Sequence, residues 1–527
     1  MKQRLKWDDY IGIFLLSASV FLLGVSVFLS FSRDIWYDEL FSLGLAVQPL
    51  GELVSITARD VHPPLYYMIV KLFLSLFGTA GSAEYVVIAK LTSVLPFFLC
   101  IVYAATKVRK HFGLSCAGLF AFLVLTMPKL ADYTVEVRMY GYALFFITAG
   151  MLHAYELACR EDTGGTGKKA YGNWAALTLY AVGACYTHYF ACVAACMIYL
   201  YLLSVLIKEK RWRELKAFFI SGLCCVVCYL PWLGAAVAMQ VGQVKENYWI
   251  QPLSWRTIPG CIKFIFQPSF AGEKTNMALA VLLFLFYGAL PVLAGNGRDV
   301  KSPEKSRQAF FSQGCMNVLA GIILFGMLAS VLLRPVFVYR YMMPGLGVFW
   351  LAFAIMTDRL RERKFIFLPV VCVLFVIGAR NYRAFYGEEM WKRVQMEAAE
   401  VALAQMGKED IILYNFDQTQ AVLSYYLDND SYLWYGKPEK LIQEMFPANH
   451  ALVEGEFSDE AGIEALKNLL AQDKPVWFFG SGNARNEIME KWSRAGIRAQ
   501  EKGSVMVERY WFNIYSLCAD SNNENIG

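Results

Sequence analysis

Blocks of about 15–21 apolar residues, almost free of charge, constrain this chain of 527 residues more than any other feature. A helix needs about 20 such residues to cross the ~30 Å hydrocarbon core of a bilayer. The composition agrees, because 57% of the residues are hydrophobic and only 18% are charged, whereas soluble proteins carry about 25% charged residues. The sequence therefore excludes a soluble enzyme, a secreted disulfide scaffold, a fibrous protein and a disordered chain.

The blocks predict a polytopic α-helical membrane protein with about eleven transmembrane helices. We expect these helices at residues 11–31, 86–106, 114–128, 139–158, 174–187, 189–207, 217–237, 277–294, 315–333, 341–357 and 365–380. Together they define a predicted transmembrane domain over residues 1–380, which includes a long first outer loop at residues 32–85.

The distribution of lysine and arginine predicts the orientation of this domain. With the N-terminus inside, the inner loops contain 22 Lys and Arg in about 70 residues, and the outer loops contain 11 in about 110. Because positive loops stay on the cytoplasmic side, we expect a cytoplasmic N-terminus in the cell membrane. An odd number of helices then places residues 381–527 outside the cytoplasm.

The last part of the chain, residues 381–527, has a different character, because charge returns and the apolar runs shorten. Alternation of strands and helices there predicts a small α/β domain. We expect strands at Ile411–Tyr414 and Val476–Phe479, helices at Thr419–Leu427, Ile463–Ala471 and Asn486–Ala495, and a hairpin within Ser504–Leu517. The turn Gly480-Ser481-Gly482 lacks the rest of a dinucleotide-binding fingerprint.

Nucleic acid is not an expected partner, since the net charge of +5 is too small to attract it. Most of the 13 cysteines lie inside apolar blocks, where a thiol behaves as a small hydrophobic group. No CxxC pair has a matching partner pair, so neither a structural metal nor a disulfide framework is indicated.

Ionisable residues beside transmembrane helices mark function by default, and in this chain they gather on the predicted outer side. Asp38 and Glu39 follow the first helix in the sequence Trp36-Tyr37-Asp38-Glu39-Leu40. The simplest interpretation is a pair of charges at a helix N-terminus that faces water. The alternative is a general base for an incoming hydroxyl, which the apolar and aromatic neighbours favour.

The same outer loop contains Asp60-Val61-His62-Pro63-Pro64. Each proline fixes its own φ and restricts the residue before it, so Asp60 and His62 are held in a defined place. The segment could equally be a plain helix-start turn. A divalent metal held by these two residues and Asp38 is conceivable, although the spacing matches no tight ligand motif.

Three arginines, Arg138, Arg334 and Arg340, lie at outer helix ends against the general charge trend. An arginine fork binds phosphate oxygens in a bidentate way, although snorkelling toward lipid headgroups is an alternative for each. Glu136 could orient Arg138 only if the intervening turn is irregular. His188 lies in a tight outer turn.

Three of these segments together resemble a known family. They are Trp-Tyr-Asp38-Glu39-Leu after the first helix, Asp60-Val-His-Pro-Pro-Leu-Tyr66-Tyr, and Glu136-x-Arg138-Met-Tyr140. The set resembles the bacterial glycosyltransferase family 39-like group of GT-C membrane glycosyltransferases, which is related to protein mannosyltransferases and aminoarabinose transferases. Arg340-Tyr341-Met-Met-Pro344 is similar to the family's Arg-Tyr-x-x-Pro element. The resemblance covers residues 8–360 and leaves the C-terminal domain unmatched.

The resemblance implies an enzyme that uses a sugar on a polyprenyl phosphate at the outer face of the membrane. It implies Asp38 as the catalytic base with Glu39 beside it, and Asp60 as a helper, although the acid lies nearer the prolines in the aminoarabinose branch. Arg138, Arg340, Arg334 and His188 are expected at the donor phosphate, and His62, Tyr66, Glu136, Tyr140 and Tyr341 in the substrate cavity. No metal or other cofactor is assigned.

The expected reaction is a single displacement that inverts the anomeric centre, with an acceptor hydroxyl on a protein, a glycolipid or a cell-wall polymer. The main alternative is a transporter or flippase of lipid-linked saccharides, which would also need charged residues around a cavity. Such a protein should show internal repeats and helices interrupted near the bilayer midplane. A non-catalytic scaffold that binds a partner through the C-terminal domain is a third interpretation.

Overall fold

The computed structural model describes residues 6–78, 82–160, 168–237, 239–240, 250–294, 303–416, 426–427, 429–507 and 509–520. The chain forms two compact units. The helical unit consists of Met1–Ser30, Leu53–Ile69 and Lys90–Gly387, and the α/β unit consists of Phe31–Glu52, Val70–Ala89 and Glu388–Gly527. The predicted domain boundary at residue 380 stays a prediction; the helix α17 (Lys364–Leu403) passes through it, and the two units divide at Gly387.

Within the described residues, eight helical segments are long and apolar enough to cross a membrane. They are Trp7–Leu29, Glu84–Phe112, Tyr189–Lys208, Trp212–Ala236, Glu273–Ala294, Pro303–Leu332, Tyr339–Glu362 and Lys364–Leu403. The protein is therefore a polytopic helical membrane protein, as predicted. The other three predicted ranges also coincide with helices, namely α7 (Leu114–Thr126), α8 (Tyr140–Ala158) and α9 (Lys168–Cys185). The count of eleven transmembrane helices stays a prediction.

The remaining helices of the bundle carry the labels used below. They are α1 (Trp7–Leu29), α5 (Ser82–Tyr103), α6 (Arg109–Phe112), α10 (Tyr189–Lys208), α11 (Leu215–Trp232), α13 (Thr257–Phe266), α14 (Glu273–Ala294), α15 (Pro303–Leu332) and α16 (Met343–Asp358). Shorter helices, α3 (Leu50–Arg59) and α4 (Leu65–Phe77), flank the Asp60 segment. Two π-helical segments, Ala104–Val108 and Leu233–Val237, follow α5 and α11.

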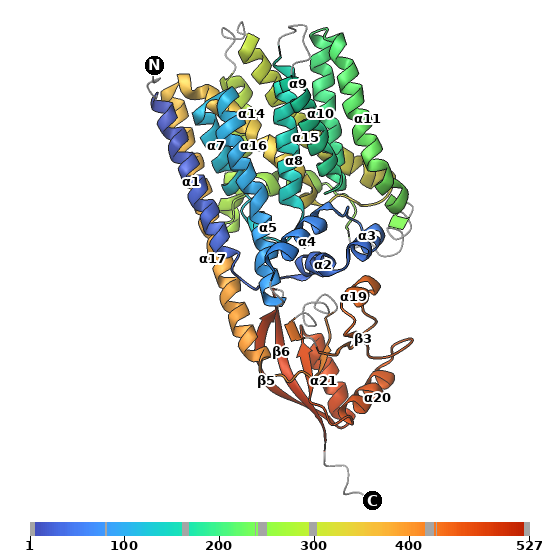
Figure 1. Ribbon diagram of the computed structural model, residues 1–527. Coiled ribbons are helices and arrows are strands. Elements are labelled where there is room, and N and C mark those ends of the chain that lie inside the picture. The colour runs from blue at the N-terminus through green and yellow to red at the C-terminus, as the bar shows by residue number, and fades with distance from the viewer. Residues whose placement is uncertain are drawn as a thin grey trace, which may run out of the picture. The chain divides into compact units, whose positions relative to one another are not determined.

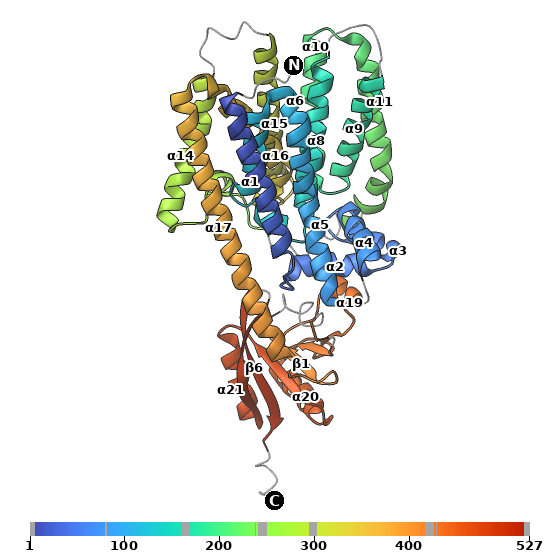
Figure 2. The same cartoon turned by 60° about the vertical axis from the view of Figure 1, so that its left-hand side comes forward.

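The centre of the helical unit is formed by α7, α8 and α16, whose residues are almost all buried. Figure 1 labels all three among the other helices, and Figure 2 shows α8 and α16 from a second direction. Every residue of α16 is buried, and α16 packs against α7, α8 and α15. Helices that are apolar all round lie in the interior of a bundle. This explains why α7 and α8 have no polar stripe in the sequence.

Helices α1 and α7 approach closely because two glycines face each other. A Cβ atom on Gly12 would lie 2.3 Å from the carbonyl oxygen of Leu114, and a Cβ atom on Gly118 would lie 2.4 Å from the carbonyl oxygen of Gly12. Small residues allow this kind of close backbone contact between membrane helices. By contrast, a Cβ atom on Gly24, further along α1, would meet nothing within 4 Å.

This contact predicts a large difference between two substitutions on one helix. Gly12→Val should lower the stability of the detergent-solubilised protein by about 1–3 kcal/mol, because the new side chain collides with backbone that cannot move away. Gly24→Val is the matched control and should leave the melting temperature close to that of the wild type. Equal melting temperatures for the two variants would contradict the α1–α7 packing.

The α/β unit is built on a six-stranded sheet with the order β3-β2-β1-β4-β6-β5. Its strands are β1 (Ile411–Tyr414), β2 (Ser431–Leu433), β3 (Asn449–Ala451), β4 (Val476–Gly480), β5 (Ile497–Val507) and β6 (Tyr510–Ala519). The strands β3, β2, β1 and β4 are parallel to one another, while β6 is antiparallel to β4 and β5. The predicted C-terminal α/β domain is confirmed, and its predicted strands and hairpin match this sheet.

Four helices lie wholly within the described part of the α/β unit, namely α2 (Tyr37–Val47), α19 (Lys440–Met445), α20 (Asp459–Leu470) and α21 (Ala484–Arg494). The predicted helices at Ile463–Ala471 and Asn486–Ala495 correspond to α20 and α21. Of the predicted helix at Thr419–Leu427, residues 419–425 lie outside the described residues, and Tyr426 and Leu427 are helical.

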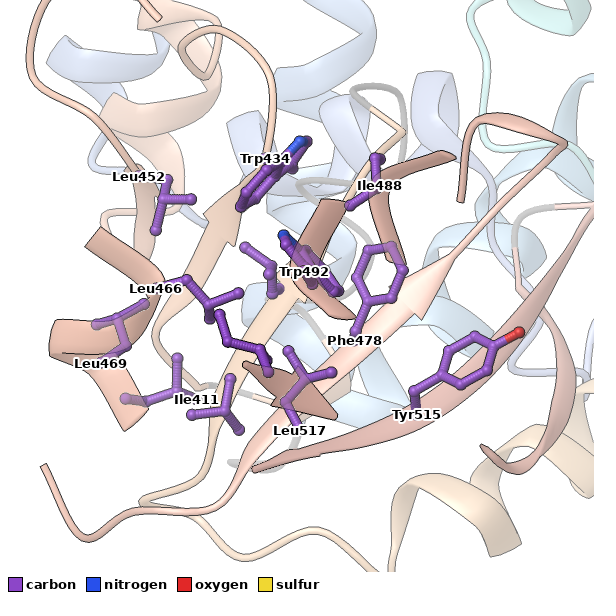
Figure 3. Close-up of a cluster of buried hydrophobic side chains, with 13 residues drawn as sticks. Ile411, Trp434, Leu452, Leu466, Leu469, Phe478, Ile488, Trp492, Tyr515 and Leu517 are labelled. Carbon is purple, nitrogen blue, oxygen red and sulfur yellow. The ribbon is translucent and has the colours of Figure 1, made fainter. Parts of the chain in front are cut away.

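One face of this sheet forms a hydrophobic core with α20 and α21 (Figure 3). Alternate strand residues such as Ile411 and Phe478 point toward Leu466 of α20 and Trp492 of α21, and Leu413 belongs to the same buried cluster. The ring of Trp492 makes an edge contact with Phe478 at a centroid distance of 4.7 Å. The strand period of two and the amphipathic helices therefore specify the same core.

Candidate functional site

His188 lies at the centre of a polar cluster in the helical unit. The cluster also contains His62, Arg138, Tyr140, Arg340 and Tyr341. It precedes α10, and its Nδ1 atom accepts a hydrogen bond of 3.1 Å from the backbone N–H of Phe190. Its ring is surrounded by three others, at centroid distances of 4.9 Å to Tyr341, 5.5 Å to Tyr140 and 5.8 Å to His62. Because Nδ1 is an acceptor, the neutral ring carries its hydrogen on Nε2.

The surroundings keep this imidazole neutral. Burial lowers the pKa of His188 well below its ordinary value, and electrostatic interactions with His62, Arg138 and Arg340 lower it further. His188 is only 2% exposed. The residue therefore offers a neutral N–H donor beside two arginines, whereas the sequence alone left its charge state open.

Asp60 and His62 lie together at the edge of this cluster. Asp60 Oδ2 is 3.4 Å from His62 Nδ1, and both side chains are mostly buried. The turn that contains the two prolines is tied to the His188 turn, since the backbone N–H of Leu65 donates to the carbonyl oxygen of Tyr186 at 3.1 Å. The stiff segment expected from the sequence therefore connects His62 with His188.

Polar contacts also brace the chain just before Asp60. Gln240 is buried, and its amide donates to the carbonyl oxygen of Thr57 at 3.1 Å. The hydroxyl of Tyr189 donates to Gln240 at 2.5 Å and accepts a hydrogen bond of 3.1 Å from the indole of Trp232. These contacts fix the end of α3, from which the Asp60 segment starts.

Arg138 enters the cluster from the turn between α7 and α8. Its side chain is 4% exposed, and its guanidinium carbon lies 6.0 Å from the ring centroid of Tyr140. The turn is irregular, because the N–H of Arg138 donates to the carbonyl oxygen of Glu136, two residues earlier, at 2.8 Å. Glu136 could orient Arg138 only across an irregular turn, and this turn meets that condition.

Tyr133 links the second arginine to the same group. Its ring lies 5.1 Å from that of Tyr140. Burial raises the pKa of Tyr133 well above its ordinary value, the charge of Glu136 raises it further, and the positive charge of Arg340 opposes the shift. Arg340 therefore acts on both Tyr133 and His188, which places it among the cluster residues.

Two further predicted residues, Tyr66 and Arg334, also belong to the helical unit. Tyr66 is fully buried and packs with Tyr142 at a centroid distance of 5.9 Å. Arg334 follows α15 in a turn that folds back on that helix, where the hydroxyl of Ser330 accepts hydrogen bonds of 3.1 Å from the N–H groups of Val336 and Phe337.

Asp38 and Glu39 belong to the α/β unit, where they lie in the first turn of α2. Glu39 is 3% exposed, and its Oε2 atom accepts a hydrogen bond of 3.2 Å from the N–H of Trp36. This is the reciprocal half of a capping box, so Glu39 stabilises the start of the helix. Asp38 is half-buried on the adjacent helical position.

Sequence reasoning overlooked Lys90. This lysine lies in α5, inside a range that was predicted only as a transmembrane helix, and it is 2% exposed. Within the described part of the chain it takes part in no ion pair or hydrogen bond. A lysine inside an apolar helical segment is itself the signal that could have identified it.

The described residues contain no group of three or more His, Cys, Asp or Glu side chains arranged to hold a metal ion. The Asp60–His62 pair supplies two such groups. The structure therefore adds nothing to the sequence-based suggestion of a metal, and the proposals below use only side chains of the chain itself.

No protein-family model and no curated protein matches the sequence. Solved structures of ArnT from Cupriavidus metallidurans are similar to it. The apo structure has a TM-score of 0.61 at 11% identity and covers 96% of this chain and 97% of ArnT. The structure bound to undecaprenyl phosphate has a TM-score of 0.59 at 12% identity, with the same coverage. AglB from Archaeoglobus fulgidus reaches only 0.44 over 88% of this chain and 69% of its own, which is too low to support an argument.

The chain therefore has the GT-C fold, the fold of membrane glycosyltransferases such as ArnT. This confirms the GT-C resemblance that the sequence motifs predicted. The likeness includes the C-terminal α/β domain, because it extends over nearly the whole of both chains. At this low identity the comparison establishes the fold, and activity has to be argued from the side chains.

The neutral state of His188 predicts a pH dependence of stability. Unfolded histidine has a pKa of about 6.5, whereas the folded chain holds the pKa of His188 well below that. Below pH 6.5 the unfolded chain therefore binds a proton that the folded chain does not bind, so stability is lost as the pH falls from about 6.5 toward the lower folded pKa. His188→Gln should remove part of this loss.

The measurement is the melting temperature of the solubilised protein between pH 7.5 and pH 5.5. The control is His450→Gln, which replaces a partly exposed histidine of the α/β unit. That variant should keep the wild-type decrease between the two pH values. A wild-type decrease in the His188→Gln variant would show that His188 is not held neutral.

Proposed function

We propose that this chain is a membrane glycosyltransferase that moves a sugar from a polyprenyl-phosphate donor to an acceptor hydroxyl on the outer face of the membrane. The observation that carries the proposal is the fold shared with ArnT over 96% of the chain. One of the ArnT structures holds undecaprenyl phosphate. Membrane lipid and a lipid-linked sugar are therefore the partners we assign, with a protein, a glycolipid or a cell-wall polymer as the acceptor.

The donor phosphate is assigned to the positive end of the site. Arg138 and Arg340 act on the buried His188, and Lys90 adds a buried ammonium group. A polyprenyl phosphate leaves already ionised, so positive groups and N–H donors that stabilise it matter more than an acid that would protonate it. His188 contributes a neutral Nε2–H donor, and Arg334 remains a further candidate.

Asp38 is assigned as the general base that removes the proton of the acceptor hydroxyl as its oxygen attacks the anomeric carbon. Glu39 caps its own helix, and Asp38, at the adjacent position, is the acid to which the family resemblance gives the role of base. Asp60, held beside His62, is assigned a supporting role in the same step. Attack from the side opposite the phosphate inverts the anomeric centre.

The transporter or flippase is the rival function. It would need helices interrupted near the bilayer midplane. The two π-helical segments of the described residues, Ala104–Val108 and Leu233–Val237, lie near the ends of the apolar stretches Glu84–Phe112 and Trp212–Ala236. Their position favours the transferase.

The first test of the proposal is Asp38→Asn. Purified protein in detergent is incubated with polyprenyl-phosphate sugars and candidate acceptors, and release of the polyprenyl phosphate is followed together with sugar transfer. Detergent offers no second compartment, so transport cannot produce the signal. We expect transfer by the wild type and a loss of about 10²–10⁴-fold in the variant, since general-base catalysis contributes that much.

The matched control for this test is Glu52→Gln, which changes an exposed carboxylate shortly after α2 in the same isosteric way. It should transfer sugar at the wild-type rate. Full transfer by a well-folded Asp38→Asn variant would remove Asp38 as the base. Absence of transfer by the wild type, together with saccharide movement across vesicles, would favour the transporter.

Lys90→Met separates a functional lysine from a structural one. A buried charge without an ion pair lowers stability, so the apolar residue should leave the melting temperature unchanged or raise it. If the ammonium group binds the donor phosphate, transfer should fall at least about tenfold, with a higher KM for the donor. Lys90→Arg keeps the charge and should retain more activity. A variant that gains stability and keeps full activity would contradict the assignment.

A further inference from the structure

We propose that the C-terminal α/β domain is a positioning device for the helix that carries Asp38, with Tyr37, Glu439, Trp36 and Arg509 as its positioning residues. The inference rests on the proposed function for the role of Asp38 as the general base, but the contacts that support it lie entirely within the α/β unit. That unit joins Phe31–Glu52 to Glu388–Gly527, although the two segments are far apart in the sequence.

The first turn of α2 is held on both sides of Asp38. The hydroxyl of Tyr37 donates to Oε2 of Glu439, just before α19, at 2.8 Å. The guanidinium carbon of Arg509, in the turn between β5 and β6, lies 4.9 Å from the ring centroid of Trp36. Trp36 and Tyr37 immediately precede Asp38, so both contacts act on the backbone that sets its direction.

The middle of α2 packs against the same domain. A Cβ atom on Gly44 would lie 2.8 Å from the ring of Phe446, which follows α19. The face that α2 buries includes Leu40, Leu43 and Leu45, each at most 1% exposed. A side chain at this position would require the Phe446 ring to move, so Gly44 allows the present close packing of α2 against the residues that follow α19.

Contacts at the two ends complete the attachment. Before α2, Arg33 forms an ion pair of 3.3 Å with Glu400, and its carbonyl oxygen accepts a hydrogen bond of 2.7 Å from Tyr426. After α2, Lys71 Nζ donates to the carbonyl oxygen of Gln48 at 2.6 Å, a favourable place for a positive charge near a helix C-terminus. Each contact is small, but together they restrict the translation and rotation of one short helix.

Restricting that helix has a catalytic consequence. A base must lie within hydrogen-bonding reach of the hydroxyl that it deprotonates, and a displacement of about 1 Å can cost about 10²-fold in rate. The donor phosphate is assigned to residues of the helical unit. Loosening α2 should therefore lower kcat and leave the KM for the donor largely unchanged.

The test uses full-length protein with Tyr37→Phe, Glu439→Gln, the double variant and Arg509→Ala. Each should lower kcat at least about fivefold, with an unchanged donor KM and a melting temperature near that of the wild type. The double variant should be no worse than the Tyr37 and Glu439 single variants, because both act on one hydrogen bond: Phe removes its donor, and Gln replaces the charged acceptor by a weaker neutral one. Arg509→Lys keeps a cation over Trp36 and should restore part of the rate. Glu490→Gln, on the exposed side of α21, is the control and should match the wild type.

Hydrogen exchange of residues 36–47 gives a second readout that does not depend on activity. Exchange should be faster in the Glu439→Gln and Arg509→Ala variants than in the wild type and the Glu490→Gln control. Wild-type kcat and exchange in both variants would overturn the inference. If the wild type transfers no sugar, the proposed function fails. The attachment of α2 is tested separately, because unchanged hydrogen exchange in the variants would refute it whatever the activity of the protein.

Discussion

The cost of keeping charge inside an apolar helical bundle governs this structure. A buried ionised group needs a counter-charge, hydrogen bonds or a neutral state, since its desolvation is otherwise too expensive. The helical unit uses each solution. His188 is neutral, Asp60 lies against His62, and Arg138 lies over the ring of Tyr140. Lys90 stands apart, buried within α5 without an ion pair among the described residues, and for that reason we assign it to an anionic substrate.

The second organising feature is the division of the candidate residues between two units. The proposed phosphate ligands belong to the helical unit, and the proposed base belongs to the unit that contains the C-terminal domain. The first outer loop is therefore not simply an appendage of the bundle. Its acidic part folds with a sheet whose strands begin more than three hundred residues later in the chain. This gives the C-terminal domain a role that its own sequence, which resembles no family, does not reveal.

Much of the fold could be predicted because it follows from local patterns. Apolar length located the transmembrane helices, and the β1 range Ile411–Tyr414 was predicted to the residue from a short apolar run between polar segments. The motifs around Asp38, Asp60 and Glu136 were sufficient to predict the GT-C fold. Helix α9 was predicted too short, since its first turns are polar and carry no hydropathy signal.

Other properties of the site depend on contacts that are distant in sequence. The cap made by Glu39 follows a local rule and could have been predicted from its position three residues after Trp36. The neutral state of His188 could not, because it depends first on burial by distant parts of the chain and then on the charges of Arg138 and Arg340, which come from two other turns. The fit of Gly44 to Phe446 likewise has no local signal, since the two residues lie about 400 positions apart.

A structure of the full chain with undecaprenyl phosphate bound is the most direct test of the central claim, because it measures where the phosphate lies relative to the proposed residues. We expect hydrogen bonds from Arg138, Arg340 or Lys90 to the phosphate oxygens, and an Asp38 carboxylate that an acceptor hydroxyl can reach. A phosphate bound elsewhere, or an Asp38 carboxylate that no acceptor can reach, would contradict the proposal.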